Sequence, residues 1–201
     1  MFREKTEWSQ LYWFNTDRKD LPRIMLIGDS IVVGHAPVLA EILANKASVA
    51  FFATSRIVGD PAYTRELMTA MADMPVDLIE FNNGLHGFHY DTEFYRNNLQ
   101  MTLEHLQTSF RCPIRWRNST PISTPDEPEK LHPERNLIVT ERNLAAAEVM
   151  KKARVQEDDM YRLMLSHPEW RSMDGYHYND EGKKVQAEFL AEILLKALAE
   201  K

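Results

Sequence analysis

Residues 23–30, with the sequence RIMLIGDS, decide the fold expected of this chain. The apolar run ends in Gly28, and Asp29 and Ser30 follow it directly, so the stretch predicts a short buried strand that ends in a tight turn. A helical stretch follows, and Pro37 is expected in its first turn, where a missing N–H is tolerated. A serine in such a strand-to-helix turn can expose its hydroxyl above the edge of a sheet.

The same alternation of short apolar runs and helical stretches continues along the chain. Further strands are predicted at 48–52, 77–81, 113–117 and 154–157, helices at 37–45, 62–73, 91–109, 135–153 and 181–199, and a Pro-rich loop at 120–133. Strands that alternate with helices are joined by right-handed crossovers and form a parallel sheet with helices on both faces. The sequence therefore predicts an α/β fold, a three-layer α/β/α sandwich, with its chemistry beyond the carboxyl ends of the strands.

Length and composition predict one globular domain over residues 1–201, with residues 1–20 as an N-terminal arm. The net charge of −6 argues against a nucleic-acid partner, because nucleic-acid-binding proteins present a basic surface. The single cysteine, Cys112, excludes an internal disulfide and a multi-cysteine zinc site. No run reaches the roughly 18 apolar residues of a membrane span, and the first residues lack the apolar core of a signal peptide. A cytoplasmic location is expected, although a secreted or periplasmic protein whose signal peptide had been removed would give the same sequence.

The hydroxyl of Ser30 needs a base to remove its proton, and the segment before the last helix supplies a candidate. In the sequence MDGYHYNDEG, residues 173–182, Asp174 and His177 are close enough for one loop to bring carboxylate and imidazole together. The carboxylate would fix the tautomer of the imidazole, and the imidazole would take the serine proton. These residue types predict a Ser–His–Asp triad, although a polar loop with an exposed histidine would have the same local sequence.

Two intermediate loops carry candidates for an oxyanion hole. Gly59 follows the second strand and would let a backbone N–H approach the substrate closely. Asn82 and Asn83 follow the third strand, and a side-chain amide can donate a hydrogen bond to a developing oxyanion. Gly and Asn also serve ordinary turns. His35 and His86, which follow the first and third strands, are further candidates for lining the pocket.

A Gly-Asp-Ser triplet after the first strand, a Gly after the second, an Asn after the third and an Asp-x-x-His before the last helix resemble the four sequence blocks of the SGNH (GDSL-like) hydrolase superfamily. The resemblance extends over nearly the whole chain and implies a flavodoxin-like fold with a five-stranded parallel sheet. It also implies hydrolysis through an acyl-enzyme, with Ser30 as nucleophile, His177 as general base and then acid, and Asp174 as the orienting carboxylate. The N–H groups of Ser30 and Gly59, with the amide of Asn82, would form the oxyanion hole.

Two blocks depart from the common pattern of the superfamily. Ile31 stands where leucine usually follows the serine, which is a minor change. The third block is NNGLHG instead of Gly-x-Asn-Asp, so aligning Gly84 with the usual glycine places His86 where Asn is expected. A variant Asn-x-Gly pattern, found in carbohydrate O-acetyl esterase and acetyltransferase relatives, matches Asn82. Asn82 is therefore preferred for the oxyanion hole, with Asn83 as the second choice.

We therefore predict a serine esterase that acts on carboxylic ester bonds, with a small-molecule or carbohydrate-borne O-acyl ester, chiefly O-acetyl, as its substrate. Analogy with the relatives and the absence of a large lid domain favour the short acyl chain. The alternatives are lysophospholipase or thioesterase activity, acyl transfer to a sugar, and a non-catalytic binding protein on the same fold. No cofactor is predicted, because the glycines around Ser30 match neither GxGxxG nor a phosphate loop. No metal is predicted, because His86 and His89 lack a nearby acidic cluster.

Overall fold

A sheet of five parallel strands, in the order β3-β2-β4-β5-β8, forms the centre of the molecule. The computed structural model describes residues 4–200. The strands are β2 (Arg23–Gly28), β3 (Ser48–Thr54), β4 (Leu78–Phe81), β5 (Ile114–Arg117) and β8 (Gln156–Asp158). This order is that of flavodoxin-like folds, whose switch point here lies between β2 and β4. The five-stranded parallel sheet is therefore confirmed.

A further strand, β1 (Ser9–Trp13), pairs antiparallel with β3 at one edge of this sheet. It belongs to the predicted N-terminal arm, of which residues 1–3 lie outside the described part of the chain. The ring of Tyr12 on β1 stacks on Phe51 of β3, with centroids 6.0 Å apart. The arm thus extends the sheet by a strand that the sequence did not predict.

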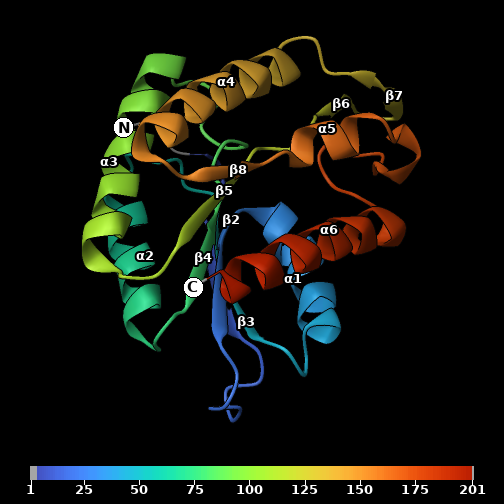
Figure 1. The fold of residues 1–201 in the computed structure, drawn as a ribbon. Coiled ribbons are helices and arrows are strands. Elements are labelled where there is room, and N and C mark those ends of the chain that lie inside the picture. The colour runs from blue at the N-terminus through green and yellow to red at the C-terminus, as the bar shows by residue number, and fades with distance from the viewer. Residues whose placement is uncertain (1–3, 201) are drawn as a thin grey trace.

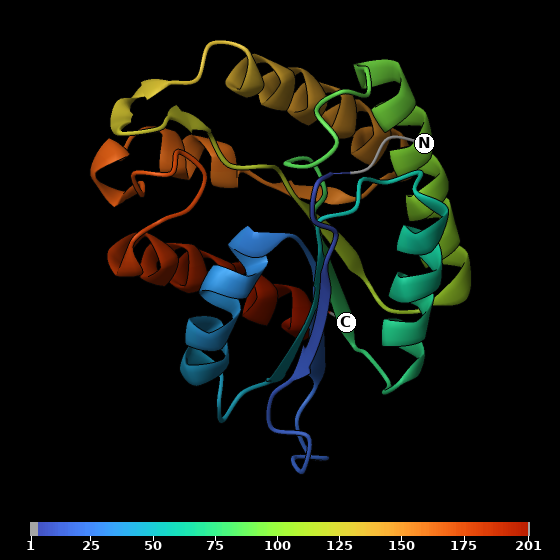
Figure 2. The ribbon, with the colours of Figure 1, turned by 180° about the vertical axis from the view of Figure 1, so that it is seen from behind.

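Helices cover both faces of the sheet, as Figures 1 and 2 show from opposite sides. One face is covered by α1 (Ser30–Ile42) and α6 (Asp180–Ala199), and the other by α2 (Pro61–Ala72), α3 (Thr92–Ser109) and α4 (Arg135–Ala153). Alternate residues of β2 belong to the two cores. Ile24 and Leu26 pack with α1 and α6, whereas Met25 and Ile27 pack with α2 and α3. The predicted three-layer sandwich is confirmed.

The helix after β2 begins earlier than predicted. It starts at Ser30, because the carboxylate of Asp29 caps it and accepts a hydrogen bond from the Ile31 N–H at 2.9 Å. Pro37 lies inside the helix, so its predicted place in the first turn is wrong. Proline is tolerated in the first turn of a helix but does not determine where the helix begins. A capping carboxylate does, because it accepts a hydrogen bond from a backbone N–H that the start of a helix leaves unpaired. The four later helices begin and end within one residue of their predicted limits.

The Pro-rich stretch at 120–133, predicted as a loop, contains a short hairpin. Its strands are β6 (Ser123–Thr124) and β7 (Glu127–Leu131). The Ser123 N–H donates to the Gly175 carbonyl and the Asp126 N–H to the Met173 carbonyl, both at 2.8 Å. The hairpin therefore holds the segment that precedes α6. Two short helices, α5 (Met160–Leu165) and η1 (Pro168–Trp170), lie between β8 and that segment.

One ion pair is buried within the sheet. The Nε of Arg117 on β5 donates to Oε1 of Glu80 on β4 at 2.7 Å, and the two side chains are 1% and 0% exposed. Burial raises the pKa of Glu80 to about 7, although the positive charge of Arg117 acts in the opposite direction. The core thus contains a carboxyl group that titrates near neutral pH.

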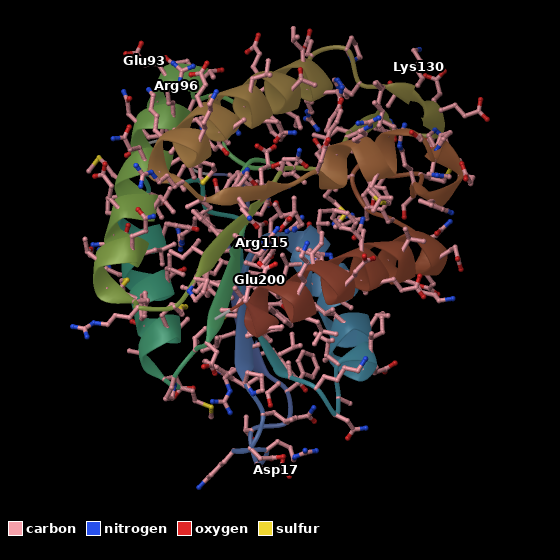
Figure 3. All side chains as sticks on the ribbon, in the orientation of Figure 1. Asp17, Glu93, Arg96, Arg115, Lys130 and Glu200 are labelled. Atoms are coloured by element: carbon pink, nitrogen blue, oxygen red, sulfur yellow. The ribbon has the colours of Figure 1, made fainter. Side chains whose placement is uncertain are left out.

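Ion pairs also join neighbouring elements on the outside of the molecule. Figure 3 shows Glu93 and Arg96 near each other on α3, and the guanidinium of Arg96 lies 3.4 Å from the carboxylate of Glu148 on α4.

Within residues 4–200, no helix combines the length and the apolar character needed to cross a membrane.

Candidate active site

Ser30 lies directly beyond the carboxyl end of β2, at the first position of α1. Asp29, which is 2% exposed, fixes this turn by capping the helix. The first N–H groups of a helix have no partner within the helix and carry the positive end of its dipole. Ser30 therefore combines a hydroxyl with a backbone N–H that is suited to binding negative charge.

His177 lies within hydrogen-bonding distance of Ser30, although 147 residues separate them in the sequence. The Nε2 of His177 is 2.9 Å from Ser30 Oγ, and its Nδ1 is 2.7 Å from Asp174 Oδ2. The second carboxylate oxygen of Asp174 accepts from the backbone N–H groups of Tyr176 and His177, both at 2.8 Å. These contacts direct the Nδ1 hydrogen towards Asp174 and leave Nε2 to accept the hydroxyl hydrogen. The structure thus brings the three predicted residues together in one chain of hydrogen bonds.

The surroundings of Asp174 favour its ionised form. Burial raises the pKa of this carboxyl, but hydrogen bonds from the backbone and ring of His177 outweigh it and hold the pKa below its usual value. Both side chains are about half exposed, Asp174 by 50% and His177 by 46%. An ionised carboxylate beside Nδ1 orients the ring and stabilises the imidazolium that forms when Nε2 takes a proton.

A glycine in the left-handed region shapes the loop that carries these two residues. Gly175 has a φ of +83°, and a Cβ built there would lie 2.3 Å from the Ser123 carbonyl oxygen on β6. Glycine alone allows both this dihedral and this close approach. The position of Asp174 and His177 therefore depends on the hairpin β6–β7.

A cleft of about 590 Å³ opens beside Ser30 and His177. Its other lining residues come from the N-terminal segment, the loop after β4, the start of α4 and the loop before α6: Glu4, Lys5, Trp8, Leu85, His86, Phe88, His89, Arg135 and Tyr176. Several of these side chains are aromatic, which is typical of small-molecule sites. The arrangement allows an ester to lie with its carbonyl carbon next to the serine hydroxyl.

The predicted asparagine donors do not line this cleft. The Nδ2 of Asn82 donates to the Arg117 carbonyl at 2.7 Å and to Ser119 Oγ at 3.2 Å, and the residue is 1% exposed. The Nδ2 of Asn83, which is 3% exposed, donates to the Arg56 carbonyl at 2.9 Å. The structure therefore does not bring Asn82, the preferred oxyanion donor, or Asn83, the second choice, to the cleft in which Ser30 lies. Buried amides need partners, and the neighbouring loops supply the carbonyl groups.

Gly59 also lies away from the cleft. It lines a separate pocket between α2 and α3, with a φ of +92°. A Cβ at this position would lie 2.6 Å from the side chain of Asn98 on α3. The structure therefore does not bring Gly59, predicted for the oxyanion hole, to the cleft in which Ser30 lies. The structural reason for this glycine is its close packing against α3.

His86, like His89, is a polar residue of the loop after β4 that lines the cleft. Its Nδ1 lies 3.0 Å from Oε1 of Glu4, which also accepts from the Gly87 N–H at 3.1 Å. Burial lowers the pKa of His86, but the hydrogen bond to Glu4 and the negative charges of Asp29, Glu4 and Glu7 outweigh it and raise the pKa above its usual value. Glu4 therefore fixes Nδ1 and favours the protonated ring, and Nε2 is the ring nitrogen left for a ligand.

His35 is buried elsewhere. Its Nδ1 lies 3.1 Å from Gln186 Oε1 on α6, and the residue has no exposed surface. Burial and the charge of Arg117 lower its pKa to about 3, so the ring is neutral and belongs to the core.

Sequence reasoning missed Glu4, Lys5 and Arg135, because nothing in their local sequence indicates a shared cleft. In residues 4–200, no three side chains of the metal-binding types His, Cys, Asp and Glu lie in one group that could hold an ion.

Solved esterases share this architecture at low sequence identity, whereas no protein-family model and no curated protein matches the sequence. An acetyl xylan esterase aligns with a TM-score of 0.70 and 15% identity, covering 86% of this chain and 99% of that chain. A member of the lipolytic G-D-S-L family from Veillonella parvula has a TM-score of 0.66 and 17% identity, with 86% and 97% covered. A carbohydrate acetylesterase family member from Sinorhizobium meliloti has a TM-score of 0.65 and 15% identity, with 89% and 99% covered. The chain therefore has the SGNH hydrolase fold that its sequence blocks predict.

Proposed function

We propose that this protein is a serine esterase that hydrolyses O-acyl esters, chiefly O-acetyl esters carried by carbohydrates. The observation that carries the proposal is the hydrogen-bond chain from Ser30 through His177 to Asp174, with distances of 2.9 and 2.7 Å, beside an open cleft. The acetylesterases among the structures of the same fold support the short acyl group and the carbohydrate. The aromatic side chains of Trp8, Phe88 and Tyr176 suit the apolar face of a sugar ring.

In the proposed reaction, Ser30 Oγ attacks the ester carbonyl carbon while His177 Nε2 takes the hydroxyl proton. Asp174 stabilises the resulting imidazolium. His177 then gives the proton to the departing alcohol oxygen, and the acyl group remains on Ser30. Water attacks the acyl-enzyme, its proton passes to Nε2, and the proton returns to Oγ as the carboxylic acid leaves.

The carbonyl oxygen gains negative charge at both attacks and needs hydrogen-bond donors. We assign one donor to the backbone N–H of Ser30 at the N-terminus of α1. We assign the second to Nε2 of His86, which lines the same cleft while Glu4 holds Nδ1. His86 would thus replace the asparagine of the usual third block, as the alignment of Gly84 with the superfamily glycine indicates.

Replacing His86 by alanine should lower kcat for p-nitrophenyl acetate by about 10²-fold, the usual effect of losing one oxyanion donor. In His86→Gln the side-chain amide keeps an N–H at a similar reach, so part of the rate should return. The wild-type rate should also fall at high pH. The neutral His86 ring keeps the Nδ1 hydrogen that it donates to Glu4 and loses the Nε2 hydrogen, so it can no longer donate to the oxyanion.

The pH profile separates this role from a structural one. The pKa of His86 is raised, so the fall should come above the usual range for histidine, and Glu4→Gln should move it to lower pH. His86→Gln should abolish this fall in rate at high pH. If the fall were unchanged in both Glu4→Gln and His86→Gln, His86 would not be a donor of the oxyanion hole.

The esterase itself is tested by p-nitrophenyl esters of graded chain length. We expect turnover of the acetate, with kcat/KM falling as the acyl chain lengthens. A preference for long chains would favour a lysophospholipase or thioesterase, and faster release of p-nitrophenol when a sugar acceptor is added would favour acyl transfer. No turnover of any ester, including acetylated sugars, by folded protein would contradict the proposal.

A further inference from the structure

Two cationic side chains line the cleft beside Ser30, although the whole chain has a net charge of −6. Among its lining residues, Lys5 and Arg135 are cations and Glu4 is the carboxylate. That carboxylate is already matched, because it accepts from the His86 ring at 3.0 Å and from the Gly87 N–H at 3.1 Å. Cations that line a cleft attract anionic ligands to it.

Arg135 is the cation whose position is defined by its neighbours. Its guanidinium carbon lies 5.5 Å from the ring centroid of Tyr176 and 5.8 Å from that of Phe88, both within the range of a cation–π contact. The guanidinium also donates to the Tyr176 hydroxyl. Within residues 4–200, the side-chain partners of this guanidinium are therefore a phenol and two aromatic rings, and none is an anion. Tyr176 directly precedes His177, so the guanidinium is held close to the catalytic loop.

The stability of α4 does not account for a cation at this position. Arg135 is the first residue of the helix, where the dipole presents its positive end, and the N-cap Glu134 makes no side-chain capping bond. A cation in the first turn acts against the dipole. The arginine is exposed, and among residues 4–200 no carboxylate forms an ion pair with it that would offset this effect. A ligand that brings a negative charge would supply the missing partner.

We propose that Arg135 binds a carboxylate on the alcohol part of the substrate, with Lys5 adding attraction, so that the protein deacylates acidic sugars such as O-acetylated uronic acids. This inference rests on the proposed esterase function and adds a substrate class to it. The planar guanidinium presents paired N–H donors that match the two oxygens of a carboxylate. Phe88 and Tyr176 hold the guanidinium and border the same cleft, so one sugar ring can contact them while its carboxylate reaches Arg135.

The test compares kcat/KM for O-acetylated galacturonic acid with that for its neutral methyl ester. The wild type should prefer the acid, and Arg135→Gln should lower the ratio of the two values about tenfold, mainly through KM, as loss of one charge-assisted interaction predicts. Arg135→Lys should retain part of the ratio. Arg96→Gln is the matched control, because Arg96 on α3 (Figure 3) pairs with Glu148 on α4 and does not line the cleft, so this variant should leave the ratio unchanged.

Three results would overturn the inference. A wild-type ratio near one, or equal losses on both esters in Arg135→Gln, would show that Arg135 only shapes the cleft. An Arg135 effect confined to p-nitrophenyl hemisuccinate would place the carboxylate on the acyl part instead of the alcohol.

Binding separates failure of this inference from failure of the esterase. Titration calorimetry with Ser30→Ala protein should show that adding Arg135→Gln raises the Kd for O-acetylated galacturonic acid about tenfold. If Arg135→Gln weakens binding in this way but the wild type turns over no ester, the proposed esterase function is refuted and the proposed anion site is supported. Turnover that depends on Ser30, with a Kd that Arg135→Gln leaves unchanged, would refute the anion site alone.

Discussion

Replacing Ser30 by alanine is expected to lower kcat for p-nitrophenyl acetate by at least about 10³-fold and to leave the fold intact. The substitution removes the oxygen that lies 2.9 Å from His177 Nε2, and with it the proposed acyl-enzyme. Alanine is favourable in a helix, and the Asp29 cap bonds to Ile31, so α1 should keep its start. The kinetics are measured on purified protein whose circular dichroism and thermal unfolding match the wild type.

Ser109→Ala provides the control for this experiment. Ser109 is the last residue of α3 and is exposed, so its hydroxyl can be removed without touching the cleft. Full activity in Ser30→Ala from a preparation free of other esterases would exclude Ser30 as the nucleophile.

Removing the imidazole in His177→Ala is expected to cost nearly as much rate as removing the serine. Without Nε2 no base takes the hydroxyl proton, and Asp174, bonded to Nδ1, has nothing left to orient. Because the residues of a triad act as a unit, the double variant with Ser30→Ala should be no slower than either single variant. The comparison needs kcat for the two single variants and the double variant under one set of conditions.

His105→Ala serves as the matched control, since His105 is an exposed residue of α3 beside a different pocket. Losses that multiply in the double variant would mean that Ser30 and His177 act in separate steps. Wild-type rates in His177→Ala would show that the 2.9 Å contact between His177 Nε2 and Ser30 Oγ is not used in catalysis.

The sheet could be predicted because its signals are local. RIMLIG is long enough and apolar enough to be a buried strand, and the helical stretches between the strands require parallel crossovers. The start of α1 was misplaced for a related reason. Pro37 is a visible marker, but the carboxylate of Asp29 bonds to the Ile31 N–H and decides where the helix begins.

The contacts among Ser30, His177 and Asp174 were predictable and the rest of the cleft was not, again for physical reasons. Asp174 and His177 share one loop, so their spacing already indicates their contact. Asn82 shows that a residue type can be recognised without its partners, since its amide donates to the Arg117 carbonyl at the end of β5 and to Ser119 Oγ beyond it. Glu4 and Arg135 come from distant segments, and only the folded chain shows that they border the same cleft.

The buried Glu80 gives the folded protein a proton that the unfolded chain does not hold near neutral pH. An exposed glutamate releases this proton near pH 4.5, whereas Glu80 keeps it to about pH 7. Between these values folding takes up a proton, so the contribution of Glu80 to the free energy of unfolding declines as the pH rises. Through Glu80, the folded state therefore gains stability as the pH falls from about 7 towards 4.5.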